Sequence, residues 1–182
     1  MDLAELHQRN NLNLCLMGGM SCLLSLIYTH EAEEVRRAAC SLVTSIVTNN
    51  RQVQEFASKS GIINLVGQFD REENIAVKSS VFSCLTAWLK ADNFEGKRRF
   101  LSEQQGLEFL TRLVTEAAGE ANFNARLRLN IHRLVDDLVL NDDGIFEEQP
   151  FYVRQHLGQH EEFLRALAQE LSRSNLQNAR DR

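Results

Sequence analysis

The feature that most constrains the fold is an internal repeat with a spacing of 42 residues. Residues 61–66 (GIINLV) repeat the apolar pattern of residues 19–24 (GMSCLL), and residues 77–82 (VKSSVF) repeat that of residues 35–40 (VRRAAC). A third copy begins at Gly106 and contains a longer connection. Units that repeat at this spacing cannot bury their apolar faces alone, so neighbouring copies are expected to stack on one another.

The repeated segments carry the apolar spacing of α-helices, at i, i+3 and i+4. In the first copy the stripe consists of Val35, Ala38, Ala39, Leu42, Val43, Ile46 and Val47, and in the second of Val77, Val81, Leu85, Trp88 and Leu89. One proline and nine glycines leave little turn material for a fold of many strands. A helical period of about 40–47 residues is typical of armadillo and HEAT repeats. We therefore predict an all-α fold, a right-handed armadillo/HEAT-like helical-repeat solenoid of about three repeats plus capping helices.

We expect one armadillo-like domain over residues 1–182. Its parts are an opening helix at 1–17, repeats at about 18–50, 51–91 and 92–141, a C-terminal cap at 142–173 and a frayed tail at 174–182. The chain should break at Gly18-Gly19 and turn sharply at Gly61. Asp142-Asp143-Gly144 and Pro150 interrupt the repeat pattern, and one helix is expected after them, at about 161–172.

The composition narrows the classes of partner. A formal net charge of −5 argues against a nucleic-acid groove, which needs a clustered basic surface. No apolar run approaches the roughly 20 residues that span a bilayer, and residues 1–5 do not read as a signal peptide. We therefore expect a cytoplasmic monomer that binds neither nucleic acid nor membrane. The alternative is the lumen of the endoplasmic reticulum, if the chain is a fragment that lacks its signal peptide.

Candidate catalytic and metal-binding groups do not assemble into a site. His156 and His160 have a spacing that suits zinc on a helix, but Gly158 lies between them and no third ligand is evident, which favours solvated surface histidines. Asp142-Asp143 reads as a turn at a helix end. No Ser-His-Asp or Cys-His arrangement can be traced. We therefore predict that the protein is not an enzyme and has no catalytic residues, metal or cofactor.

Two residue types that often mark function are better explained by packing. Trp88 falls in the repeat register with Ile46 and Leu138, which both lie on apolar stripes, so we expect it in the core rather than at a binding hot spot. Cys40 and Cys84 lie in apolar helical stretches, where a thiol behaves as a small hydrophobic group.

The third helix of each armadillo unit lines the concave surface, and these helices are expected at 35–48, 77–90 and 127–140. Removing the apolar stripe leaves a polar face on each helix. The predicted partner-binding residues are Arg37, Ser41, Ser45, Thr48, Lys78, Ser83, Thr86, Lys90, Arg133, Asp137 and Asn141. Short hydroxyl side chains allow a partner to approach closely, and the Arg133–Asp137 pair supplies charge that fixes register. The alternative is a solvated face with one weak ion pair within a helix.

Several short segments occur in an order and spacing that carry a family resemblance. They are 13–20 (NLCLMGGM), 35–39 (VRRAA), 53–56 (VQEF), 61–65 (GIINL), 82–85 (FSCL) and 99–101 (RFL). Over roughly residues 13–139 the chain resembles the armadillo-type nucleotide exchange factors of 70-kDa heat-shock chaperones. This is the heat-shock-protein-binding protein family, with cytosolic and endoplasmic-reticulum branches. Residues 144–182 depart from it, because they do not continue clear repeats.

The resemblance implies a mechanism and a partner. In this family the concave face binds one lobe of the chaperone's ATPase domain and holds open the cleft that grips ADP, so that ADP leaves. By position, Ser41, Ser45, Ser83, Arg133 and Asp137 are the best contact candidates. Such a factor is a co-chaperone, not an enzyme, and holds no nucleotide itself.

Two rival interpretations stay open. A generic armadillo adaptor captures an extended peptide with asparagines and tryptophans on its third helices, whereas the matching positions here hold Ser45, Ala87 and Asp137. A structural helical-repeat segment of a larger scaffold would bind no chaperone.

Overall fold

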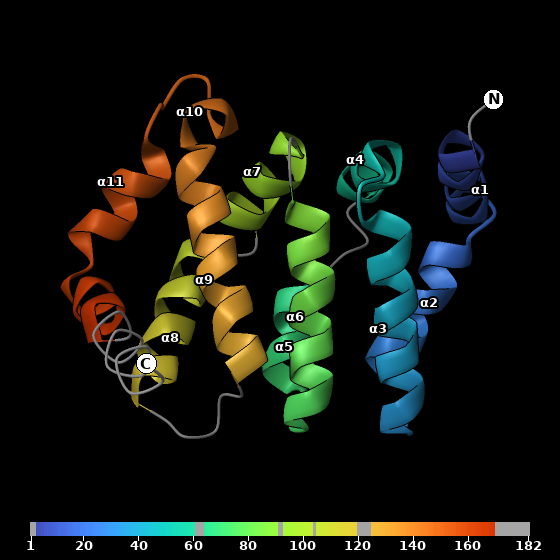
Figure 1. Ribbon diagram of the computed structural model, residues 1–182, viewed down its shortest axis with the longest axis horizontal. Coiled ribbons are helices and arrows are strands. Elements are labelled where there is room, and N and C mark those ends of the chain that lie inside the picture. Colours follow the sequence, from blue (N-terminus) through green and yellow to red (C-terminus); the bar gives the residue numbers. More distant parts are fainter. Residues whose placement is uncertain (1–2, 61–63, 91–92, 104, 120–124, 170–182) are drawn as a thin grey trace, which may run out of the picture. The chain divides into compact units, whose positions relative to one another are not determined.

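The structure is a computed structural model that describes residues 3–60, 64–90, 93–103, 105–119 and 125–169 (Figure 1). Over these ranges the chain forms helices joined by short connections, with no β-strand. The prediction of an all-α, armadillo-like fold is therefore confirmed. The chain divides into two compact units, Met1–Phe100 and Leu101–Arg182, each with its own packed helices. The right-handed superhelix and the single domain over residues 1–182 stay predictions.

The first unit contains two copies of one helix pair. Its helices are α1 (Leu3–Leu16), α2 (Gly19–Thr29), α3 (Glu33–Val47), α4 (Arg51–Ser60), α5 (Leu65–Arg71) and α6 (Ile75–Leu89), and α7 (Phe94–Glu103) crosses the boundary between the units. The α2–α3 pair and the α5–α6 pair lie side by side, because α3 packs on both α2 and α6 (Figure 1). The 42-residue repeat of the sequence is thus a structural repeat.

The predicted break at Gly18-Gly19 is confirmed. Gly18 ends the first helix with a φ of +89°, a left-handed conformation that glycine adopts without steric cost. Residues 7–16 and α2 meet there at an angle of 71°. Among the described residues no single helix is long and apolar enough to cross a membrane, although this bent pair together meets the same length and composition test. The turn expected at Gly61 lies outside the described residues.

The starts of the repeated helices are fixed by local chemistry. Asn74 caps α6, where its Oδ1 accepts hydrogen bonds from the backbone N–H groups of Ala76 at 2.8 Å and Val77 at 3.2 Å. Helix α3 instead begins with Glu33 and Glu34, whose negative charge suits the positive end of the helix dipole. Both repeats of the first unit therefore enter their third helix at a defined residue.

The cores follow the predicted register. Ile46 and Trp88 are buried in the first unit, and Leu138 is buried in the second, so the core assignment of Trp88 is confirmed. The second unit contains α8 (Gly106–Gly119), α9 (Ala125–Leu140), α10 (Asp142–Ile145), α11 (Tyr152–Gln159) and a further helix at 161–169. Helix α8 packs on α9, and α11 packs on both. The helix expected at 161–172 is present as far as the described residues reach, but α11 was not predicted.

Asp142 explains how α11 begins after an irregular stretch. Its carboxylate oxygens accept hydrogen bonds from the backbone N–H groups of Val153 and Arg154, both at 2.9 Å, and the residue is fully buried. Phe151, which precedes α11, has a φ of +66° and offers no side-chain cap. A carboxylate from 11 residues upstream thus replaces the usual N-cap side chain. The turn predicted at Asp142-Asp143 is in fact the short helix α10.

Replacing Asp142 should therefore destabilise the second unit. We expect Asp142→Ala to lower the free energy of unfolding by about 1–3 kcal/mol, because two backbone donors lose a charged acceptor in a buried place. Urea unfolding followed by far-UV circular dichroism would measure this loss of unfolding free energy. Asp143→Ala is the matched control. The Asp143 side chain is 68% exposed, and its ion pair with Arg154 is long at 4.0 Å. This variant should lower the free energy of unfolding by less than about 0.5 kcal/mol. Equal losses in the two variants would contradict the capping role.

Candidate partner-binding surface

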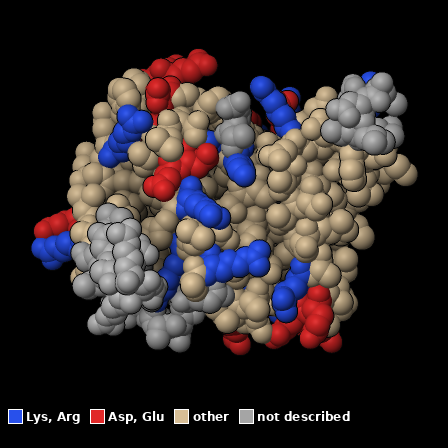
Figure 2. All heavy atoms as spheres, in the orientation of Figure 1, with Lys and Arg blue, Asp and Glu red and all other residues tan. Residues whose placement is uncertain are grey.

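The predicted contact residues of α3 lie on one exposed face. Arg37, Ser41 and Ser45 are exposed along the helix, and Thr48 is exposed at its C-terminal cap. Over this helix the surface in Figure 2 is largely uncharged, with acidic side chains gathered at the lower end, where α3 begins. We call Arg37, Ser41, Ser45 and Thr48 the α3 face.

The structure corrects part of the predicted core beside the α3 face. Leu42 is 48% exposed and Ala38 is exposed too, so their assignment to the buried stripe is wrong, and Cys40 is buried in their place. Leu42 lies between Ser41 and Ser45 in the sequence and shares their exposure. An exposed leucine among short hydroxyl side chains offers apolar area that a partner can cover.

The predicted residues of α6 are more enclosed than those of α3. Ser83 and Thr86 are half-buried, and Lys90 is exposed at the C-terminal cap. Lys78 is half-buried, with its Nζ 5.1 Å from the centre of the Phe69 ring on α5. The ammonium group therefore interacts with the aromatic face of its own repeat.

Several hydroxyl groups on these helices donate their proton to their own helix. The Oγ of Ser83 donates to the carbonyl of Ser79 at 2.8 Å, and the Oγ1 of Thr86 lies 3.0 Å from the carbonyl of Ser83. At the end of α3, the Oγ1 of Thr48 donates to the carbonyl of Thr44 at 2.6 Å. A hydroxyl that donates inward keeps its lone pairs for outside groups. The exposed Thr48 hydroxyl oxygen at the end of α3 thus presents a hydrogen-bond acceptor.

In the second unit the predicted residues lie at the C-terminal half of α9. Arg133 is exposed and Asp137 is half-buried. The side-chain amide of Asn141 donates to the backbone carbonyl of Asp137 at 2.7 Å and to its Oδ1 at 3.3 Å. The second of these bonds ties the Asp137 carboxylate to the end of α9. The joining of this group and the α3 face into one concave surface stays a prediction.

A sulfur contact joins α3 to α6. The Cys84 thiol donates to the backbone carbonyl of Cys40 at 3.0 Å, and its Sγ lies 3.3 Å from the Thr44 hydroxyl. Both cysteines are buried, as expected of thiols that pack as small hydrophobic groups. The Cys84 thiol and then burial raise the pKa of Cys40 well above its usual value, so this thiol is neutral at physiological pH. Cys22 is the exposed cysteine among these described side chains.

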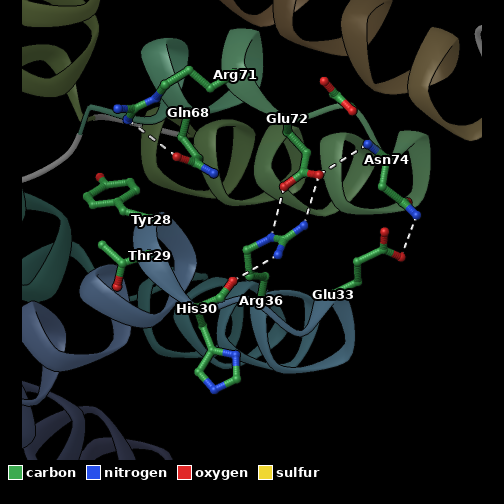
Figure 3. A pocket seen from close by; sticks show the side chains of 10 residues that line it. Tyr28, Thr29, His30, Glu33, Arg36, Gln68, Arg71, Glu72 and Asn74 are labelled. Atoms are coloured by element: carbon green, nitrogen blue, oxygen red, sulfur yellow. Dashed lines mark hydrogen bonds and ion pairs between the residues drawn. The ribbon is translucent and has the colours of Figure 1, made fainter.

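A polar pocket of about 370 Å³ lies where the loop between α2 and α3 meets the loop between α5 and α6 (Figure 3). We call it the corner pocket. Its lining consists of Tyr28, Thr29, His30, Glu33, Arg36, Gln68, Arg71, Glu72, Glu73 and Asn74.

The wall of the corner pocket is an ion pair between the two repeats. Arg36 Nε donates to Glu72 Oε2 at 2.9 Å, and Nη2 donates to Oε1 at 3.1 Å. Arg36 Nη1 also donates to the backbone carbonyls of His30 and Glu31, each at 2.8 Å, while Glu72 Oε1 accepts from the Asn74 N–H at 3.1 Å. The two side chains are only 15% and 5% exposed. Because these contacts hold successive loops together, we assign Arg36 and Glu72 a structural role.

The histidine pair in α11 differs from its prediction. His156 and His160 are half-buried rather than solvated, and their Nε2 atoms lie 3.1 Å apart. Within the described ranges, no group of three or more His, Cys, Asp or Glu side chains is placed to hold a metal ion.

Stacked helix pairs with polar faces on their third helices define an all-α helical-repeat protein. The chain matches the family model described as the SIL1/FES1/HPBP1 C-terminal domain over residues 10–172. It therefore belongs to this family of Hsp70 nucleotide exchange factors, as its sequence resemblance suggested. The match continues to residue 172, so the expected departure from the family after residue 144 is wrong for residues 144–172. No curated protein and no solved structure gave a match.

Proposed function

We propose that this protein promotes ADP release from a 70-kDa heat-shock chaperone by binding the chaperone's ATPase domain. The family match over residues 10–172 carries the proposal, because it spans most of both units. The exposed α3 face supports it, since its short side chains leave room for a folded partner to approach along the helix. The protein acts as a monomer, holds no nucleotide and carries out no chemistry.

The mechanism requires a difference in affinity between two states of the chaperone. A factor that binds the open and closed ATPase domain equally shifts nothing, however tightly it binds. Contact with one lobe must therefore be stronger when the nucleotide cleft is open. By linkage, ADP then weakens binding of the factor by the same ratio as the factor weakens binding of ADP.

The test is release of a fluorescent ADP from a chaperone ATPase domain, chased with excess ATP, with increasing amounts of this protein. We expect the release rate to rise with concentration and to saturate. The affinity for the ATPase domain, measured by calorimetry, should fall when ADP is present. A folded sample that leaves the release rate unchanged with every chaperone tried would contradict the proposal and favour the adaptor or scaffold alternatives.

The same assay addresses the compartment, for which we propose the cytoplasm. A cytosolic and a lumenal chaperone ATPase domain would be compared at equal concentrations. Faster release from the cytosolic one is the expected result, and preference for the lumenal one would assign the protein to the endoplasmic reticulum.

A further inference from the structure

We propose that His156 and His160 form a binding site for one divalent transition-metal ion of the class that prefers imidazole ligands, with Zn²⁺ as the reference ion. The pair lies where α11 ends and the helix at 161–169 begins. The proposed exchange activity uses neither side chain, so the proposal is independent of that function.

The positions of the two nitrogens match those of two ligands on one metal. The Nε2 atoms of His156 and His160 are 3.1 Å apart, and the ring centres are 4.8 Å apart. Two Zn–N bonds of about 2.0–2.1 Å place their nitrogens about 2.9 Å apart at a right angle and about 3.3 Å apart at a tetrahedral angle. The observed separation falls between these values. Both rings already bring the same nitrogen, Nε2, within reach of one ion.

The surrounding rings restrict the orientation of His156. Tyr152 stacks on the His156 ring with centres 6.0 Å apart, and Phe146 packs edge-on against Tyr152 at 4.9 Å. His160 is half-buried at the C-cap of α11. A metal ligand that is held in place by its neighbours loses less conformational freedom when the ion binds.

The local electrostatics favour a cation. Both histidines lie at the C-terminal end of α11, where the helix dipole is negative. His160 also lines a pocket of about 400 Å³ to which the acidic residues Glu108, Glu116 and Glu162 contribute. Arg112 also lines this pocket and lies 3.8 Å from Glu116, which offsets part of its charge.

The number of protein ligands sets the kind of site. In the described part of the chain, no third His, Cys, Asp or Glu completes a set with this pair, so water fills the remaining positions. A site with open positions and room for water is expected to be exchangeable and moderate in affinity, unlike a closed structural zinc site. Imidazole ligands suit Zn²⁺, Ni²⁺ and Cu²⁺, with Cu²⁺ bound most tightly.

The competing explanation of the same geometry is an N–H···N hydrogen bond between two neutral imidazoles. That explanation predicts no saturable binding of metal. A titration with Zn²⁺ therefore distinguishes a metal site from a hydrogen bond.

The experiment is calorimetric titration of the metal-free full chain with Zn²⁺. A Cys22→Ser background removes the exposed thiol, which would otherwise bind zinc. We expect one equivalent to bind. His156→Phe, which keeps a ring against Tyr152, and His160→Gln should each weaken binding at least about tenfold, because one of two protein ligands is lost. The control His7→Asn removes an exposed histidine from the other unit and should leave binding unchanged.

Thermal melting provides a second measurement. Zn²⁺ should raise the Tm of the parent but not of His156→Phe, because an ion that binds only the folded state stabilises it. Absence of saturable binding by the parent, or equal binding by His156→Phe, would overturn the proposal. So would equal weakening by His7→Asn.

Discussion

Arg36→Ala is expected to lower the free energy of unfolding of the first unit by about 3–5 kcal/mol. The change removes both hydrogen bonds that Arg36 donates to Glu72, whose side chain is 5% exposed in the native protein. It also removes the bonds that Arg36 donates to the carbonyls of His30 and Glu31. The cost of a buried charge without its counter-ion dominates the result. Urea unfolding followed by Trp88 fluorescence measures it, because Trp88 is the single tryptophan of the chain and is buried in this unit.

Two further variants make the result specific. Arg51→Ala breaks an ion pair of similar length, 2.7 Å to Glu55, whose side chains are 72% and 40% exposed, and it should cost only about 0.3–0.5 kcal/mol. Arg36→Met combined with Glu72→Met should recover much of the loss, because removing both charges leaves neither one buried and unpaired. If Arg36→Ala cost no more than Arg51→Ala, the ion pair would not hold the two loops together.

The second large effect is expected in nucleotide exchange. Ser41→Arg combined with Ser45→Arg should reduce the acceleration of ADP release at least about tenfold at subsaturating factor, which corresponds to about 1.4 kcal/mol of binding free energy. Two long cationic side chains replace short hydroxyl groups on the α3 face, next to Arg37, so a partner can no longer approach closely. The melting temperature should change little, because both serines are exposed.

The matched control lies on the neighbouring helix. Ser21 and Ser25 are exposed on α2 with the same spacing of four, so Ser21→Arg combined with Ser25→Arg adds the same charge to the same unit. This control should leave the exchange rate unchanged. Equal loss in both double variants would indicate a general effect of charge, and no loss in either would exclude the α3 face as the contact surface.

The helices of the repeats could be predicted because their signal is local. Apolar residues at helical spacing placed α2, α3, α6, α8 and α9. Helix α11 escaped prediction because Tyr152–Gln159 has few apolar residues and contains Gly158. It is held instead by the Asp142 carboxylate from a distant position, which a periodic pattern does not report.

The exposure of Leu42 could not be predicted for a related reason. The apolar stripe shows which face of a helix is hydrophobic, but burial depends on the neighbouring helix. Cys84 occupies the equivalent position in the next repeat and is fully buried, because it faces α3. Leu42 has no such cover among the described residues.

The Arg36–Glu72 pair was missed because it joins two loops. Its members are 36 positions apart, which is not the repeat spacing, and both are charged residues that usually lie at the surface. One signal was available. Glu72 is the repeat equivalent of His30, so it lies at the corner that corresponds to the one whose carbonyl accepts from Arg36. The prediction that the contact residues form one continuous surface stays a prediction. It depends on how the two units are arranged, which a periodic sequence pattern does not specify.

The Cys84–Cys40 contact determines how far apart the hydroxyl groups of α3 and α6 lie. A thiol that reaches the backbone carbonyl of the neighbouring helix at 3.0 Å is possible only where the two helices approach closely. A larger side chain at position 84 would separate them, and the row containing Ser41 and Ser45 would move away from the row containing Ser83 and Thr86. Under the proposed function, a change at the fully buried Cys84 would therefore alter the contact surface without changing any residue exposed on it.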